Sequence, residues 1–484
     1  MNTLSTPEER RSANLRVGLF GIGLDAYWPQ FKGLRERLLG YMGDVKARIT
    51  RPGIEVVDLG LVDTVERAFA AGRRFRSEDV DLIVLHVTTY ALSSTVLPVV
   101  LRAKVPVLVL NLQPSAAIDY ERFNAMDDRT RMTGDWLAHC SACPMPEIAN
   151  VFKRAGIHFH QVTGVIADGD PCWREVDEWL EAARVAAGMF GNRLGVMGHY
   201  YSGMLDIQSD LTLQTVTFGT HIEHIEVDEL SALRREVPAD EAEARRRYFT
   251  EKFDVQADCP EEDLLEAART SVALDRLVSR YGLGALAYYY KGTGIADNEV
   301  TLASIILGMS LLTARHVPVA GEYEIKNAQA MKIMDLFGCG GSFTEYYAMD
   351  FNDDVVLMGH DGPGHIAIAE GKTKVRPLKV YHGKVGRGVS VEMAVKHGPV
   401  TLLSVIEHEG KLALLFAEAE SVAGPILEIG NTNSRYRFPC GAREFVNRWN
   451  SHGPAHHCAV GVGHIAAKMD KLGRLLGLAA IRVC

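Results

Sequence analysis

Four residues in the last third of the chain place carboxylate and imidazole groups at or near the ends of apolar runs. Glu322 follows the run VPVAG, and Glu345 lies within the aromatic segment SFTEYY. His360 follows VVLMG, and His457 precedes CAVGV. Two carboxylates and two imidazoles can bind one divalent cation, and mixed oxygen and nitrogen ligation favours Mn²⁺ or Co²⁺ over a thiolate-bound zinc ion. The pattern predicts a metal site formed by these four residues.

Sequence spacing alone does not establish that these side chains converge. Taken singly, each glutamate is more consistent with a solvated loop carboxylate, and each histidine with a satisfied structural side chain. His456 directly precedes His457, and neighbouring strand residues point to opposite faces. We therefore expect one of the two to face inward, and His456 is a candidate for lining the substrate pocket.

The elements before this cluster must position it. The first third of the chain alternates continuous apolar runs with amphipathic stretches of helical spacing. Continuous apolar runs separated by helices are typical of a parallel sheet covered on both faces. The pattern predicts a doubly wound, Rossmann-like α/β domain over residues 1–165. The predicted strands are 15–20, 54–59, 81–87 and 105–110, and the predicted helices are 30–42, 65–76 and 93–102.

Two further domains follow from the pattern. The alternation of strands and helices resumes after residue 165, with strand candidates at 193–198, 220–227 and 285–290. This predicts a central α/β domain over residues 166–325. From about residue 340, short apolar runs are interrupted by Gly and His rather than by helices, which favours an antiparallel β domain over residues 326–484.

Composition narrows the class of protein. The chain has 484 residues and a formal net charge of −9, a balance that argues against nucleic-acid and anionic-membrane partners. Residues 1–14 lack the apolar segment of a secretory signal, and the longest helix-like apolar run, 302–312, is too short to cross a bilayer. Eight cysteines are ordinary usage for this length. We expect a soluble cytoplasmic protein with reduced thiols.

Two other motifs contain residue types that could support chemistry. Gly21, Gly23 and Ala26 give a partial dinucleotide fingerprint, but the acidic residue expected about 20 positions later is missing, since the second strand ends near Asp58. An NAD-linked oxidoreductase that uses this turn is therefore an alternative function, and no dinucleotide site is predicted. The CxxC pair of Cys140 and Cys143 is consistent with redox or metal chemistry, but an incidental role is favoured.

The order GEYEIKNA, SFTEYYAMDF, VVLMGHD and GPAHHC resembles the L-arabinose isomerases and, more broadly, the L-fucose/L-arabinose isomerase group. Weaker collinear matches are LIVLHVTTYALSS, VPVLVLNLQP and RLGVMGHYY. The resemblance implies that Mn²⁺, or another divalent cation such as Co²⁺ or Mg²⁺, binds Glu322, Glu345, His360 and His457, with the two glutamates as the acid–base pair. It also implies a C-terminal β-barrel-like domain and a homo-oligomer, either a tetramer or a hexamer.

Departures from the family lie in the N-terminal domain. Cys143 stands where these isomerases carry a histidine that approaches the sugar, and Asp25, Tyr27 and Trp28 replace the glutamine and histidine expected after the first strand. We therefore expect an aldose–ketose isomerase that acts, through an enediolate, on a free pentose or (deoxy)hexose other than L-arabinose. A non-catalytic sugar-binding protein is the remaining alternative.

Overall fold

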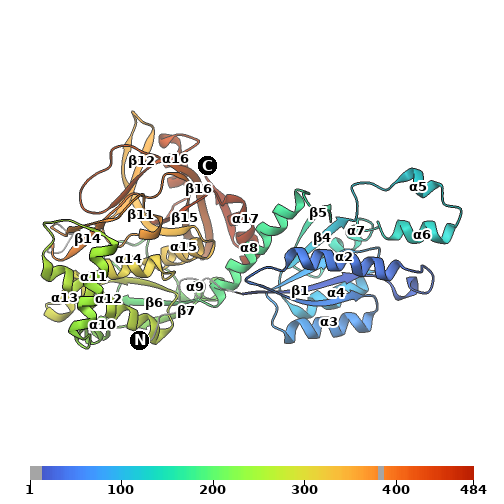
Figure 1. Ribbon diagram of the computed structural model, residues 1–484, viewed down its shortest axis with the longest axis horizontal. Helices are drawn as coiled ribbons and strands as arrows, with labels where there is room; N and C mark the ends of the chain where they lie inside the picture. Colours follow the sequence, from blue (N-terminus) through green and yellow to red (C-terminus); the bar gives the residue numbers. More distant parts are fainter. Residues whose placement is uncertain (1–13, 380–385) are drawn as a thin grey trace. The chain divides into compact units, whose positions relative to one another are not determined.

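The structure is a computed structural model that describes residues 14–379 and 386–484 (Figure 1). The expectation that the chain begins without a secretory signal concerns residues 1–14, nearly all of them outside this described part. The described residues divide into two compact units, and the division falls between Ala187 and Gly188 within helix α8 (Cys172–Phe190). The division into three domains at 1–165, 166–325 and 326–484 stays a prediction.

The N-terminal unit contains a five-stranded parallel sheet in the order β2-β1-β3-β4-β5. Its strands follow the apolar runs, and the segment LIVLH of β3 is buried at every position. Parallel neighbours require crossover helices, so the sheet is doubly wound, as predicted. The strands are β1 (Leu15–Ile22), β2 (Ile54–Val62), β3 (Leu82–His86), β4 (Val107–Gln113) and β5 (Phe159–Val165). The helices are α2 (Leu34–Ile49), α3 (Val65–Ser77), α4 (Ser93–Ala103), α5 (Tyr120–Asn124), α6 (Arg129–Leu137) and α7 (Met145–Arg154).

The second unit begins with another parallel sheet, of four strands in the order β10-β9-β6-β7. All four strands point the same way, so the segments that follow β6, β9 and β10 leave the sheet at one edge. The strands are β6 (Arg193–Gly198), β7 (His221–Ile225), β9 (Ala285–Tyr289) and β10 (Val319–Ala320). The helices are α9 (Leu211–Phe218), α10 (Val227–Arg235), α11 (Ala239–Lys252), α12 (Glu261–Tyr281), α13 (Ala296–Ala303) and α14 (Ile306–Ala314).

The same unit ends in an antiparallel barrel, which confirms the predicted fold class. Six strands follow one another as β15-β18-β11-β12-β17-β16, and pairing of β15 with β16 closes the ring. The interior is apolar, and β19 (Ala479–Arg482) adds to β16 in parallel. The barrel strands are β11 (Gly340–Asp350), β12 (Val355–His360), β15 (Gly398–His408), β16 (Lys411–Ser421), β17 (Thr432–Arg437) and β18 (Cys458–Val462). A small sheet of β8 (Asp254–Val255), β13 (Lys374–Pro377) and β14 (Val389–Glu392) and the helices α16 (Ala442–Ser451) and α17 (Ala466–Leu476) complete the unit.

Helix α15 (Ile325–Leu336) connects the parallel sheet to the barrel. Every residue of this helix is buried, and it packs against β9 and β10 as well as β11, β15 and β18. Two of its charged residues are paired within the core: Lys332 Nζ donates to Asp335 Oδ2 at 2.9 Å, and His316 Nδ1 donates to Asp335 Oδ1 at 2.6 Å. The helix therefore has a fixed position between two cores.

One expectation about the cysteines is wrong. A disulfide joins Cys440 and Cys484, so these two thiols are not reduced, whereas Cys140 and Cys143 are free. No local pattern indicates this pair, because the two cysteines are 44 positions apart and are brought together by the tertiary fold. Within the described residues, no helix has the length and apolar character needed to span a membrane.

The buried Asp335 predicts a pH dependence of stability. Burial alone raises the pKa of this carboxyl, but the Lys332 ammonium and the His316 hydrogen bond outweigh it and lower the pKa from 3.8 to about 2. A depressed carboxyl pKa stabilises the fold above the unfolded pKa, and this stabilisation is lost as the pH falls from about 4 towards 2. At pH 7, Asp335→Asn is expected to lower the free energy of unfolding by roughly 2–3 kcal/mol.

Urea unfolding of the full chain at pH 7 and near pH 2 measures this effect. Asp470→Asn is the matched control, because Asp470 forms an exposed ion pair with Arg474 and its loss should cost less than about 1 kcal/mol. Equal destabilisation by Asp335→Asn at both pH values would show that the ionised carboxylate is not what stabilises the helix.

Candidate metal centre

Glu322 lies in a strained turn between β10 and α15. Glu322 and Tyr323 both adopt left-handed backbone conformations, with φ of 60° and 63°. Such a conformation costs an L-residue roughly 1–2 kcal/mol, so the surroundings must hold it. The Tyr201 amide donates to the carbonyl of Glu322 at 3.3 Å, and the Tyr323 amide donates to the carbonyl of Tyr288 at 3.0 Å. Backbone strain at a candidate ligand is typical of functional sites.

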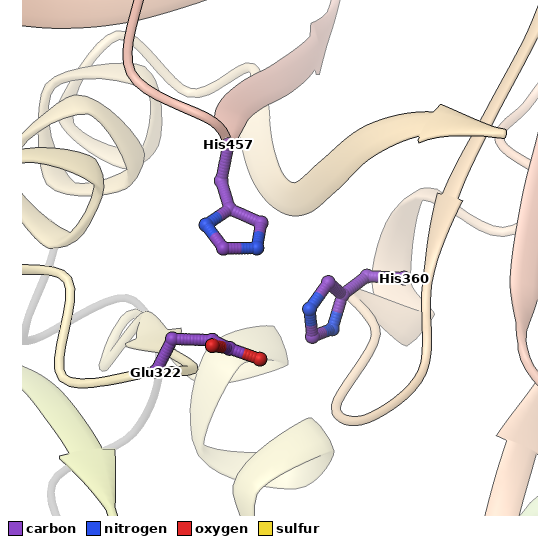
Figure 2. Close-up of side chains that lie close together, drawn as sticks. All are labelled: Glu322, His360 and His457. Atoms are coloured by element: carbon purple, nitrogen blue, oxygen red, sulfur yellow. The ribbon is translucent and has the colours of Figure 1, made fainter. Parts of the chain in front are cut away.

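Three of the four predicted ligands converge. One ligand atom each from Glu322, His360 and His457 lies within 4.8 Å of the others. Figure 2 shows the two imidazoles and the carboxylate facing one another from three separate segments. The ring of Phe343 packs against both imidazoles, with centroid distances of 4.5 Å to His360 and 4.3 Å to His457. This packing restricts how the two rings can turn.

Both histidines are in the protonation state that a metal requires. His360 is 7% and His457 1% exposed, and burial lowers the pKa of each to about 3. Both imidazoles are therefore neutral at physiological pH, and a neutral imidazole is the metal-binding form. The Nδ1 atom of His360 is buried and has no hydrogen-bond partner among the described residues. The donor set and this unsatisfied buried nitrogen fit a divalent cation.

Glu345 approaches the same centre but belongs to a second, overlapping group with His456 and His457. His456 Nε2 donates to Glu345 Oε2 at 2.5 Å, and the same oxygen lies 3.7 Å from His457 Nε2. Burial raises the pKa of Glu345, but the hydrogen bond from His456 and the nearby imidazoles outweigh it and lower the pKa overall. Glu345 is therefore ionised and adjacent to His457, with His456 as its nearest partner.

Glu324 is the residue that sequence reasoning missed. Its carboxylate is fully buried, and Oε2 accepts a hydrogen bond from His457 Nδ1 at 2.5 Å. With the proton on Nδ1, the lone pair of His457 lies on Nε2, the nitrogen that faces Glu345. The Oε1 atom of Glu324 is buried without a hydrogen-bond partner among the described residues, and burial raises the pKa of this carboxyl. Glu324 thus orients His457 from the Nδ1 side, and in its ionised form it would hold the proton on Nδ1.

Among the candidate residues of the N-terminal unit, Tyr27 and Cys143 lie close together, and Trp28 and Asp25 have other partners. Burial raises the pKa of Tyr27, and the neighbouring Tyr90, Cys140 and Cys143 raise it further, so Tyr27 and Cys143 are close. Trp28 Nε1 donates to Asp63 Oδ2 at 2.8 Å. Asp25 is exposed and accepts a hydrogen bond from the Ala26 amide at 2.8 Å. Their roles toward a sugar stay predictions.

The turn after β1 does not have the form of a dinucleotide loop. A short 3₁₀ helix, η1 (Asp25–Tyr27), follows the strand, and α2 begins only at Leu34. A dinucleotide fingerprint places the helix N-terminus directly at the glycines. A Cβ on Gly23 would lie 2.7 Å from the Trp28 ring, so this glycine provides space for an indole.

The contact between Glu324 and His457 predicts a loss of metal affinity. Glu324→Gln replaces the carboxylate by a weaker acceptor that no longer selects one tautomer of His457, so the dissociation constant for Mn²⁺ is expected to rise by about 10–100-fold. Electron paramagnetic resonance of free Mn²⁺ during a titration measures this dissociation constant. Glu444→Gln, an exposed substitution on α16, is the control. An unchanged dissociation constant in Glu324→Gln would contradict the positioning role.

Comparisons with known proteins bear on the C-terminal region. Residues 340–479 match the family described as the L-arabinose isomerase C-terminal domain. No protein among those curated for function matches the chain. Among solved structures, one match is a periplasmic solute-binding protein of an ABC transporter from Actinobacillus succinogenes 130z with bound D-allose, at 12% identity, 63% of this chain, 95% of that chain and TM-score 0.17. Another is D-lactate dehydrogenase from Escherichia coli, at 11% identity and TM-score 0.15. The match covers 67% of this chain and 93% of the dehydrogenase chain.

TM-scores this low carry no argument about fold or function. The family match carries more weight, although it covers under half of the chain. It includes three barrel strands that carry or adjoin Glu345, His360 and His457, namely β11, β12 and β18. The barrel of this protein is therefore similar to the C-terminal domain of L-arabinose isomerases, and this similarity supports a sugar isomerase.

Proposed function

We propose that the protein is a metal-dependent aldose–ketose isomerase that acts on a free pentose or (deoxy)hexose other than L-arabinose. The observation that carries the proposal is the convergence of Glu322 and Glu345 on the same buried neutral histidine, His457. The family match of the barrel supports the same reaction class. The proposal includes Mn²⁺ as the cation, with Co²⁺ or Mg²⁺ as alternatives, and a cytoplasmic homo-oligomer.

The reaction moves one proton between neighbouring carbons of the sugar. A base removes the proton from the carbon beside the carbonyl, an enediolate forms, and the proton returns to the other carbon. A second group moves the hydroxyl proton between the two oxygens. A bound divalent cation would supply Lewis-acid stabilisation of the negative charge on these oxygens.

Glu322 and Glu345 are the groups that would move these protons. Glu345 is kept ionised by the hydrogen bond that His456 donates to it, so it can accept a proton. Glu322 is held in position by its strained backbone and the hydrogen bond from Tyr201. His360 and His457, being neutral, would bind the cation without adding charge that opposes it.

A panel of aldoses and ketoses, assayed for interconversion with Mn²⁺ and with a chelator, tests the proposal. At least one sugar pair other than L-arabinose and its ketose should interconvert. Glu322→Gln and Glu345→Gln should each lower kcat by a factor of about 10²–10⁴, because each removes a proton-transfer group. His457→Ala should abolish metal-dependent turnover. Chelation should abolish turnover in the wild type, and added Mn²⁺ should restore it.

Glu444→Gln is again the control and should retain full activity, because its side chain is exposed on α16. Full activity in Glu322→Gln or in Glu345→Gln would contradict the proposed function. Turnover that persists in the presence of chelator would also contradict it.

A further inference from the structure

Two aromatic segments emerge side by side next to the candidate metal centre. The segment His199-Tyr200-Tyr201 follows β6, and Tyr289 ends β9. The two strands are parallel neighbours with Gly198 opposite Tyr289. Gly198 has a φ of +92°, and a Cβ there would lie 1.9 Å from the carbonyl oxygen of Tyr289, so only glycine permits this approach. The His199 amide donates to that carbonyl at 3.1 Å.

Three rings form a contiguous aromatic cluster, which we call the aromatic platform (His199, Tyr201 and Tyr289). The ring of Tyr201 lies 4.9 Å from that of Tyr289, inclined by 56°, and the ring of His199 lies 5.3 Å from that of Tyr289, edge to face. Tyr201 and Tyr289 are half-buried and His199 is exposed. The platform is therefore rigid yet partly accessible to solvent.

The platform adjoins Glu322. The Tyr201 amide donates to the Glu322 carbonyl at 3.3 Å. Burial raises the pKa of Tyr289, and the nearby Tyr201 hydroxyl and Glu322 carboxylate add to the effect, so the phenol stays neutral. The catalytic candidate and the aromatic rings thus lie at the same edge of the central sheet.

The segment that carries His199 and Tyr201 is also fixed on the barrel side of the centre. Lys326 Nζ donates to the carbonyl of Asp206, and the amide of His456 donates to Asp206 Oδ2 at 2.8 Å. The loop therefore has contacts near both candidate carboxylates, Glu322 at one end and the Glu345–His456 pair at the other. This anchoring holds the platform in a constant position relative to the reacting groups.

The surroundings of the platform disfavour a phosphorylated ligand. The loop after Tyr290 contains Lys291 and two glycines, but the Gly294 amide already donates to Glu299 Oε1 at 3.1 Å. The helix that follows, α13, carries Asp297 and Glu299 in its first turn, where their charges repel an anion from the helix N-terminus. Lys326 is occupied by the Asp206 carbonyl.

We propose that the aromatic platform stacks against the C–H face of a neutral, unphosphorylated sugar and holds its carbonyl end at Glu322. Sugar C–H groups carry a small positive charge, and the faces of aromatic rings are negative, so the two surfaces attract while water is displaced. The inference rests on the proposed function and names the residues that select the substrate. Tyr201 and Tyr289 are the specificity-determining residues of this site.

Alditols test the platform without requiring turnover, because they have the shape of an open-chain sugar but no carbonyl group. Xylitol, ribitol and the arabitols are titrated into the Mn²⁺-loaded full chain by calorimetry. For the tightest alditol, Tyr289→Leu and Tyr201→Leu should each raise the dissociation constant by about tenfold, the size expected for loss of one aromatic face. Tyr289→Phe keeps the ring and should stay within about threefold of the wild type.

Controls separate the platform from a loss of fold. Tyr248→Leu, an exposed tyrosine on α11, should leave alditol binding unchanged. All variants should retain the Mn²⁺ dissociation constant of the wild type. Glucitol 6-phosphate should bind no more tightly than glucitol, and binding more than tenfold tighter would overturn the assignment of a neutral sugar.

The outcomes distinguish the platform from the isomerase. One outcome is that both Leu variants weaken alditol binding while no sugar is turned over. This outcome supports the platform and contradicts only the proposed isomerase activity. Sugar turnover with unchanged KM and alditol affinity in both Leu variants overturns the platform and leaves the isomerase standing. Failure of every alditol to bind the Mn²⁺-loaded wild type also overturns the platform.

Discussion

Helix α15 is buried at every position between the central parallel sheet and the barrel, and the geometry of the candidate site depends on this constraint. Because the helix has no exposed face, its charged side chains need partners within the protein, and Lys332 and Asp335 pair with each other and with His316. The helix can then neither slide nor rotate without leaving a buried charge unpaired. Glu322 and Glu324 precede its first turn, so the fixed helix sets the position of both carboxylates.

The barrel provides the other half of the site for a topological reason. The strands β18, β11 and β12 are consecutive neighbours in the closed ring, so residues near their ends lie within a few strand spacings of one another. This adjacency brings together Glu345, His360 and His457, although Glu345 and His457 are 112 positions apart in the sequence. The contact of Glu324 with His457 then couples the helix to the barrel at the centre itself.

The sequence predicted the elements whose signal is local. Continuous apolar runs such as LIVLH indicated the parallel strands, and Gly- and His-interrupted runs indicated the antiparallel region. Glu322, His360 and His457 were identifiable because each lies at the end of an apolar run. The boundary in the structure, within α8, was not predicted, because a continuous amphipathic helix gives no signal of where one compact unit ends.

Features that depend on tertiary contacts or on unusual backbone conformations were not predictable. Glu324, which contacts His457, directly follows the left-handed residues Glu322 and Tyr323, a conformation that residue type alone does not indicate. The pairing of Glu345 with His456 depends on the pairing of β11 with β18, and the Cys440–Cys484 disulfide joins segments that follow β17 and β19, which both pair with β16. The aromatic platform depends on the parallel register of β6 and β9, with Gly198 opposite Tyr289.

We propose that one divalent cation binds between the turn after β10 and the ends of the barrel strands. Anomalous diffraction from crystals of the protein grown with Mn²⁺ can locate this cation. A manganese peak is expected about 2.0–2.4 Å from a carboxylate oxygen of Glu322 and from a nitrogen of both His360 and His457, with Glu345 turned toward the ion. A peak at another place, or no peak between these residues at saturating Mn²⁺, would contradict it.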